Sequence, residues 1–249
     1  MKIILFAGRY GLSGVPIAQY RLAESFARNG HEVELVYGRV LDNTILPHNQ
    51  NFKINVLNKN KISLIFFKII NILYKQKPDI IFSAGDHLNA IVLLAGILVN
   101  SKSKFSCSSR VTPFDTYSNK LFSKNWILKK VMKMVMHKAT VLSCVSKDMV
   151  QQYKKIFNNS KHVAIYNIVK NKETEAKMHE KLNEKDEIYF KKKYTIISAG
   201  MLERWKRHED LIYAFDYFKY KNECNLLILG DGSRRKILEK QIKNLKLEH

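Results

Sequence analysis

Two short segments in the last third of the chain place glycine and positive charge where a strand gives way to a helix. Residues 200–206 read Gly-Met-Leu-Glu-Arg-Trp-Lys and follow a short apolar strand, and a second apolar strand runs into Gly230-Asp231-Gly232. A helix that begins at such a turn directs its free backbone N–H groups and the positive end of its dipole there, which favours anions. These residues predict a phosphate site, with the Lys206 ammonium as its compact cation.

A third turn of this kind lies near the amino terminus. Ser13-Gly14 follows a predicted strand at residues 2–7 and opens a predicted helix at residues 15–29. A glycine here lets the backbone approach a phosphate closely. The pattern is not the Gly-x-Gly-x-x-Gly dinucleotide fingerprint, so a purely structural turn is an equal alternative on the residues alone.

Polar residues follow two further predicted strands, where ligands of open α/β sheets bind. Asp86 and His87 come after a strand at residues 80–83, and Arg110 lies near the end of a strand at residues 105–111. An arginine can hold a phosphate through two parallel hydrogen bonds. These three residues are candidates for binding a second substrate. Helix capping is the alternative for His87, and an ordinary surface position is the alternative for Arg110.

The alternation of apolar strands and helices predicts the fold that must position these residues. Strands are expected at residues 2–7, 32–37, 52–57, 80–83, 105–111, 141–145 and 163–166. Helices between them predict a doubly wound parallel sheet. Residues 169–193 are charged and carry no strand pattern, which indicates a hinge, with one surface helix as an option. The alternation of strands and helices begins again at Tyr194 and predicts two strands, at residues 195–199 and 226–229.

The order of these motifs resembles glycosyltransferase family 4, whose retaining enzymes have two Rossmann-like domains in the GT-B fold. That family opens its second domain with Gly-Arg-Leu, a lysine and an apolar helix ending in Ala-Phe. Gly200-Met201-Leu202, Lys206 and Ala214-Phe215 match this segment. Met201 departs from the pattern, because the family carries an arginine there that shares the donor diphosphate. Arg204 and Arg207 are the nearby cations, although neither has the family's spacing.

Other segments extend the resemblance over almost the whole chain. Gly230-Asp231-Gly232 with Arg235 matches the family's Gly-Asp-Gly-x-x-Arg, and Ser13-Gly14 matches its glycine pair near the donor phosphate. Pro78-Asp79-Ile80-Ile81 is similar to the family's Pro-Asp-Val-Val strand. Ser146 and Tyr166-Asn167 also match, and we interpret them as caps and turns.

The resemblance implies a retaining transferase of hexosyl or N-acetylhexosaminyl type. It would move a sugar from a nucleotide-diphosphate donor to a glycan or lipid-linked acceptor in cell-surface polysaccharide or lipopolysaccharide synthesis. Lys206 would be catalytic, and no metal or other cofactor is implied. The implied donor-binding residues are Ser13, Gly14, Gly200, Lys206, Gly230, Gly232 and Arg235. The implied acceptor-binding residues are Asp86, His87 and Arg110.

The expected domains are an acceptor-binding domain at residues 1–168, the hinge at 169–193 and the beginning of a nucleotide-sugar domain at 194–249. Two βα units bury little apolar area. The family's pair of glutamates, which holds donor sugar and ribose, has no counterpart. The sequence therefore predicts a fragment that does not itself transfer sugar. The alternative, favoured by Met201 and the missing glutamates, is a non-catalytic module that docks on a membrane or a partner enzyme.

Charge and composition bear on partners and location. The formal net charge is +21, and residues 101–168 alone carry 13 Lys/Arg against two Asp/Glu. A solvated basic face, an anionic membrane and nucleic acid are the three explanations. No RRM, KH, helix-turn-helix or zinc-finger pattern supports nucleic acid. A solvated basic face needs no partner and stays open; where the charge does serve a partner, the expected one is an anionic membrane. Three scattered cysteines indicate reduced thiols, and the apolar run 90–99 is too short to span a bilayer. The expected location is cytoplasmic, peripheral on the inner face of the membrane.

Overall fold

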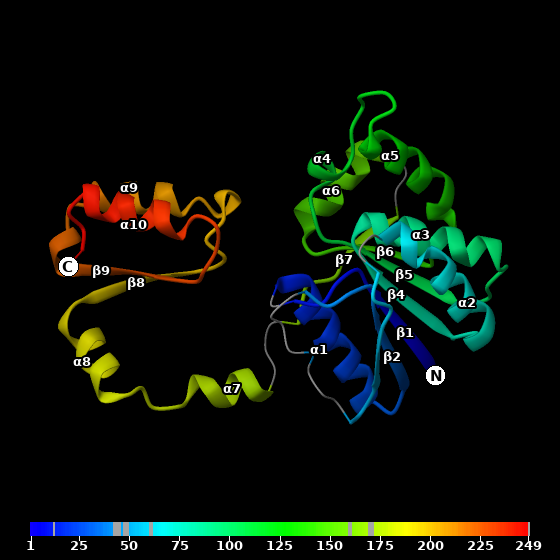
Figure 1. Cartoon of the computed structure of the whole chain (residues 1–249), viewed down its shortest axis with the longest axis horizontal. Coiled ribbons are helices and arrows are strands. Elements are labelled where there is room, and N and C mark those ends of the chain that lie inside the picture. The colour runs from blue at the N-terminus through cyan, green and yellow to red at the C-terminus, as the bar shows by residue number, and fades with distance from the viewer. Residues whose placement is uncertain are drawn as a thin grey trace. The chain divides into compact units, whose positions relative to one another are not determined.

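The computed structural model describes residues 1–11, 13–41, 46, 50–59, 62–158, 161–168 and 172–248. By its internal contacts the chain divides into two compact units, Met1–Asn171 and Lys172–His249, whose elements are labelled in Figure 1. Each unit is described by itself. The predicted hinge at 169–193 and the domain limits drawn beside it stay proposals.

The first unit is built on a seven-stranded parallel sheet with the order β3-β2-β1-β4-β5-β6-β7 (Figure 1). The strands are β1 (Lys2–Ala7), β2 (Glu32–Tyr37), β3 (Lys53–Val56), β4 (Ile80–Ala84), β5 (Lys104–Ser109), β6 (Val141–Cys144) and β7 (His162–Ala164). The order reverses at β1, as in a doubly wound fold. The prediction of about seven parallel strands is confirmed, although β5 ends two residues earlier than expected.

Helices cover both faces of this sheet. They are α1 (Gly14–Arg28), α2 (Phe66–Gln76), α3 (Asp86–Leu98), α4 (Pro113–Thr116), α5 (Lys124–Val135) and α6 (Lys147–Ile156), with 3₁₀ turns at Ile62–Ile65 and Met136–Lys138. Successive strand residues point to opposite faces. Leu5 and Leu35 thus pack with Ala23 of α1, whereas Ile4 and Phe6 belong to the larger core formed with α2, α3, α5 and α6. Ser146 caps α6 by accepting from the backbone N–H of Met149 at 3.1 Å, which confirms the predicted cap.

The second unit holds two parallel strands, β8 (Tyr194–Ala199) and β9 (Cys224–Leu229). Its helices are α7 (Lys172–Met178), α8 (Glu184–Lys192), α9 (His208–Asp216) and α10 (Arg235–Asn244), with 3₁₀ turns at Arg204–Lys206 and Lys221–Glu223. Leu202, Ile212 and Leu238 form its small buried cluster. The two predicted strands of the second sheet are confirmed. The charged segment before them holds two helices where the sequence suggested one at most.

Candidate functional site

The carboxyl edge of the first sheet gathers the five predicted site residues of the first unit. Ser13 and Gly14 follow β1, Asp86 and His87 follow β4, and Arg110 follows β5. Because β1, β4 and β5 are neighbours and run parallel, their carboxyl ends share one edge. The sequence had indicated this edge, and the structure brings these five residues onto it.

The Asp86 carboxylate is a buried hydrogen-bond acceptor, 4% exposed. Ser109 Oγ and the Tyr117 hydroxyl donate to Oδ1 at 2.9 and 2.8 Å, and the Tyr153 hydroxyl donates to Oδ2 at 2.8 Å. Burial raises the pKa of Asp86, and the three hydroxyl donors oppose that rise. The neighbouring His87 is exposed on the first turn of α3, where a ligand could reach it.

Arg110 lies over a cavity of about 260 Å³ beneath α1. Its Nη1 donates to Oδ1 of Asn167, while its buried Nε has no partner among the described residues. Burial lowers the pKa of Arg110. Gln19 lines the same cavity, is 1% exposed, and its Oε1 has no partner in the described part of the chain. Sequence reasoning placed Arg110 at the edge but missed Gln19, because a lone glutamine on a helix gives no signal.

A second cavity, of about 380 Å³, opens beside the start of α1 and is lined by Ser13. A Cβ at Gly14 would meet no atom within 4 Å, so the backbone is open to a ligand there. Three cations also line this cavity: Arg9, Arg39 and Lys59. Sequence reasoning missed all three. Their common signal is a basic residue two or three positions beyond the ends of β1, β2 and β3.

In the second unit, the loops that follow β8 and β9 are bound together through their backbones. The N–H of Gly200 donates to Leu229 O, and the N–H of Leu202 donates to Asp231 O, each at 2.9 Å. A Cβ at Gly230 would lie 1.9 Å from Gly200 O, and one at Gly232 would lie 2.6 Å from Leu202 O. Both glycines are therefore required by close backbone packing.

Lys206 is an exposed cation of this turn. Its side chain runs over Gly200, since a Cβ there would lie 3.8 Å from both Cδ and Cε of Lys206. Lys206 is exposed, and within the described residues no carboxylate pairs with it. Arg207 pairs with Asp210, and Arg235 pairs with Glu239 at 2.9 Å and with Asp231 at 3.7 Å.

Arg204 differs from Arg207 and Arg235. It lies in the 3₁₀ turn with Lys206, is exposed, and pairs with no carboxylate in the described part of the chain. The position predicted for the family arginine, Met201, is 46% exposed and has no charge. The turn thus offers two unpaired cations, Lys206 and Arg204, and Arg235 is engaged within its own helix.

Comparisons with known proteins identify the family. Residues 12–172, well over half of the chain, match the family described as Glycosyltransferase Family 4. The chain belongs to this family. Residues 168–249 match Glycosyl transferases group 1. An uncharacterized glycosyltransferase of Methanocaldococcus jannaschii is 26% identical over 220 residues, which cover 85% of this chain and 54% of that protein.

Solved structures place this family 4 chain in the GT-B fold. Anabaena HepE in complex with UDP has a TM-score of 0.72 at 15% identity, covering 100% of this chain and 67% of that one. A glycosyltransferase of Rickettsia africae has a TM-score of 0.70 at 19% identity, covering 100% and 66%. The lipopolysaccharide outer core galactosyltransferase WaaB has 0.68 at 15%, covering 100% and 66%. This chain thus spans about half of the curated relative and two thirds of these structures.

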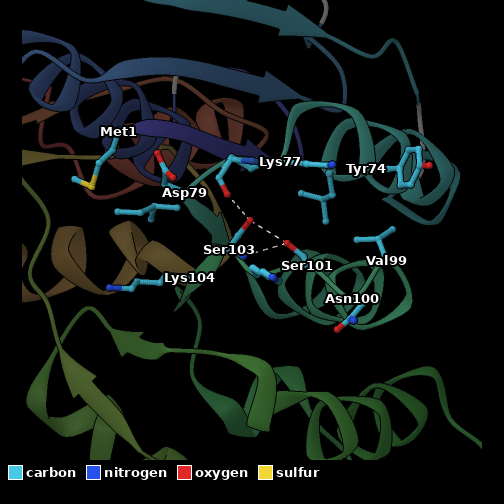
Figure 2. Close-up of a pocket in the computed structure, with 13 residues that line it drawn as sticks. Met1, Tyr74, Lys77, Asp79, Val99, Asn100, Ser101, Ser103 and Lys104 are labelled. Carbon is cyan, nitrogen blue, oxygen red and sulfur yellow. Dashed lines mark hydrogen bonds between the residues drawn. The ribbon is translucent and has the colours of Figure 1, made fainter.

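A roomier cavity, about 860 Å³, lies at the opposite edge of the first sheet (Figure 2). Ser103 donates to Pro78 O, and the hydroxyls of Ser101 and Ser103 are 2.9 Å apart. The Asp79 carboxylate accepts from the backbone N–H of Lys2 at 2.7 Å. These hydrogen bonds stabilise the loops that precede the strands. Ligands of open α/β sheets bind at the carboxyl ends instead, so this cavity is not the site of the family 4 chain.

Within the residues that the structure describes, no group of three or more His, Cys, Asp or Glu side chains is placed to hold a metal ion. Cys107 and Cys144 are buried and Cys224 is partly buried, all three as free thiols. Burial raises the pKa of Cys107 to about 12, which makes that thiol a poor nucleophile. The described helices include none that is long and apolar enough to cross a bilayer.

Proposed function

We propose that the chain is part of a retaining glycosyltransferase that moves a sugar from a nucleotide-diphosphate donor to a glycan or lipid-linked acceptor. One observation carries this proposal: the turn after β8 holds Lys206 unpaired over Gly200, directly before the start of α9. Leaving-group charge develops on the donor diphosphate, and an ammonium fixed beside it stabilises that charge. Arg204 is the second cation, in place of the family arginine lost at Met201.

In this proposal the donor also contacts Gly200 and the Gly230–Gly232 turn of the second unit. Donor binding by Ser13 and Gly14 of the first unit stays a separate prediction, which competition with UDP tests below. Arg235 orients the Gly230–Gly232 turn through its ion pair with Asp231. His87 and Arg110 contact the acceptor, and Asp86 holds the edge that presents them. HepE is solved with UDP and with UDP-glucose, which supports a uridine-diphosphate sugar as the first donor to examine. The domain limits at residues 168 and 194, with a hinge between them, belong to the same proposal.

The test is a transfer screen with UDP-sugars on the product of the complete reading frame, beside the 249-residue chain. Lys206→Ala should lower the turnover of the complete protein by about 10²- to 10³-fold, the range for removing one group that stabilises developing charge. Lys240→Ala is the matched control, because Lys240 is an exposed lysine of α10 in the same unit. Equal turnover in the two variants contradicts the role of Lys206.

We also propose that the first unit docks on an anionic membrane surface. Leu121 and Phe122, between α4 and α5, are 64% and 82% exposed, and Figure 1 shows this connection projecting from the unit. Lys120 and Lys124 flank the pair on either side. An apolar tip between lysines suits a surface that offers acyl chains beneath anionic headgroups. This supports a peripheral location on the inner face of the membrane.

The docking surface also supports the second candidate function, a non-catalytic module derived from a glycosyltransferase. The two candidates differ in one measurement. The module binds anionic vesicles but gives no sugar transfer from any UDP-sugar when the complete reading frame is expressed. The enzyme gives transfer that depends on Lys206.

A further inference from the structure

The cavity beside α1 gathers positive charge from three separate segments of the chain. The described residues that line it include Arg9, Arg39 and Lys59 and no aspartate or glutamate. Arg39 is half-buried, and Arg9 and Lys59 are exposed. In the described part of the chain, none of the three pairs with a carboxylate. Like charges that surround one space repel each other, and an anion in that space relieves the repulsion.

Backbone hydrogen bonds fix these cations side by side. The N–H of Gly38 donates to Ala7 O at 2.9 Å, and the N–H of Tyr10 donates to Arg39 O at 2.8 Å. The N–H of Lys59 donates to Gly38 O at 2.7 Å. The segments beyond the three strands are thus bound to each other as the strands are. The convergence of the cations is therefore a property of the sheet and not of flexible side chains alone.

The approach of these segments is unusually close at Gly38. A Cβ there would lie 2.5 Å from Gly8 O, so only glycine lets the β2 segment lie against the β1 segment at this point. That contact brings Arg39 to the cavity wall that Arg9 and Ser13 also form. The amino end of α1 adds its own preference for negative charge. Three side-chain cations and one helix start then converge on one space.

The size of the cavity limits the ligand. About 380 Å³ is the room of roughly a dozen waters, at about 30 Å³ each. A phosphate with one small attached group fits this volume, and an oligosaccharide does not. Guanidinium groups match phosphate oxygens through paired hydrogen bonds. Because β2 and β3 lie on the far side of β1 from β4, Arg39 and Lys59 extend the site away from His87 and Arg110.

We propose that this cavity binds a phosphate group of the acceptor, so that the acceptor is a phosphorylated sugar or a lipid phosphate and not a neutral glycan. The assignment of this phosphate to an acceptor rests on the proposed function. The binding itself does not depend on transfer, so it is measured without any donor. Loss of transfer with intact phosphate binding therefore overturns the proposed function alone.

The experiment titrates the 249-residue chain by ligand-observed NMR at constant ionic strength. The probes are inorganic phosphate, glucose 6-phosphate, glucose, and dodecyl phosphate in uncharged detergent micelles, with the micelles alone as blank. We expect saturable binding of the phosphates and none of glucose. Tighter binding of glucose 6-phosphate than of dodecyl phosphate assigns a soluble sugar phosphate as acceptor, and the reverse order assigns a lipid phosphate.

Two double variants of equal charge change decide whether the cavity is responsible. Arg39→Gln with Lys59→Gln should weaken phosphate binding about tenfold or more, since hydrogen bonds to charged groups are among the strong ones. Lys75→Gln with Lys155→Gln removes two exposed lysines from α2 and α6 and should change it less than twofold. Equal weakening in both variants, or no phosphate binding at all, overturns the proposal.

Competition with UDP distinguishes an acceptor-phosphate site from a donor-diphosphate site. If UDP displaces glucose 6-phosphate from the chain, and the Arg39/Lys59 variant loses UDP binding in parallel, the cations serve the donor diphosphate and the proposal is wrong. We expect no displacement. Circular dichroism and the unfolding midpoint of both variants should match the parent, because the replaced side chains make no hydrogen bond or ion pair among the described residues.

Discussion

The Tyr153 hydroxyl donates a 2.8 Å hydrogen bond to Oδ2 of Asp86 across 67 residues of sequence. It joins α6 to the first turn of α3, at the carboxyl edge of the sheet. Tyr117 and Ser109 donate to the other carboxylate oxygen. The buried Asp86 carboxylate thus joins the residue before His87 to Ser109, the residue before Arg110. It holds both candidate residues in place although it is itself shielded from solvent.

The first prediction tests this network through Tyr153→Phe. The substitution keeps the ring, which contacts Tyr117 and Phe157, and removes one of three donors to a buried carboxylate. We expect the free energy of unfolding of the first unit to fall by about 1–3 kcal/mol, the range for a buried polar group left short of a partner. Urea unfolding measures it. Tyr74→Phe, at a position 69% exposed, is the control, and equal stability in the two variants contradicts the prediction.

The second prediction concerns pH and His162. This residue is 6% exposed, its Nδ1 has no partner among the described residues, and its ring lies 4.6 Å from that of Tyr153. Burial lowers the pKa of His162 from 6.5 to about 4. The unfolded chain therefore binds the proton more tightly, so the stabilising effect is present above pH 6.5 and is lost as pH falls toward 4. The steepest slope from this group is about 1.4 kcal/mol per pH unit.

The His162 effect is isolated by difference against His162→Phe, which retains a ring but cannot titrate. Burial raises the pKa of Asp86, so the folded state holds that proton more tightly and stability from Asp86 falls as pH rises, the opposite sign. Both proteins contain Asp86, and its contribution cancels. We expect the parent to lose stability relative to His162→Phe between pH 6.5 and 4. Parallel pH profiles refute the prediction.

The third prediction compares two glycines with opposite surroundings. Gly230→Ala places a Cβ 1.9 Å from Gly200 O, whereas Gly14→Ala places one in open space. The first cannot be accommodated without separating the β8 and β9 loops, at a cost of about 3 kcal/mol or more for a forced overlap. In Gly230→Ala, hydrogen exchange at the amides of Gly200 and Leu202 should lose protection while the first sheet keeps its own. Gly14→Ala should leave both units protected.

Local patterns were sufficient to predict the strands and most of the helices. Apolar runs with regular helices between them identified all nine strands that the described residues form, because burial on a parallel sheet needs only the local sequence to be apolar. Helix α4 was missed, since its four residues are too few to show a period. The two helices before β8 were underestimated for a related reason: α8 has no buried residue, and therefore no apolar face to recognise.

The site could be predicted only in part, because the order of the strands in the sheet cannot be derived from any single segment of the sequence. Asp86 and Arg110 were placed at the right edge, since both follow strands. Burial of Asp86 depends on Tyr117 and Tyr153, which come from distant parts of the chain. Arg9, Arg39 and Lys59 converge only because β1, β2 and β3 are neighbours, so each alone is an ordinary basic residue.

The last prediction concerns membrane docking by the loop before α5. Phe122 is 82% exposed, and its ring lies 5.6 Å from that of Trp126, over which Lys130 Nζ sits at 5.4 Å. Ring burial favours binding to any bilayer, whereas each nearby lysine adds about 1 kcal/mol only when the lipids are anionic. Flotation with anionic vesicles should therefore show binding that weakens as salt screens the lysines.

Two variants separate the apolar and the charged contributions to this docking. Leu121→Ser with Phe122→Ser should reduce binding at every salt concentration, because it removes apolar side chains and no charge. Lys129→Glu with Lys130→Glu and Lys133→Glu should abolish binding at low salt and leave little salt dependence, because it reverses three charges on α5. Phe67→Ser is the control, since Phe67 is 77% exposed on α2, outside the loop. Equal flotation with neutral vesicles would contradict the preference for anionic lipid, and the same loss in Phe67→Ser would show that this loop is not the docking surface.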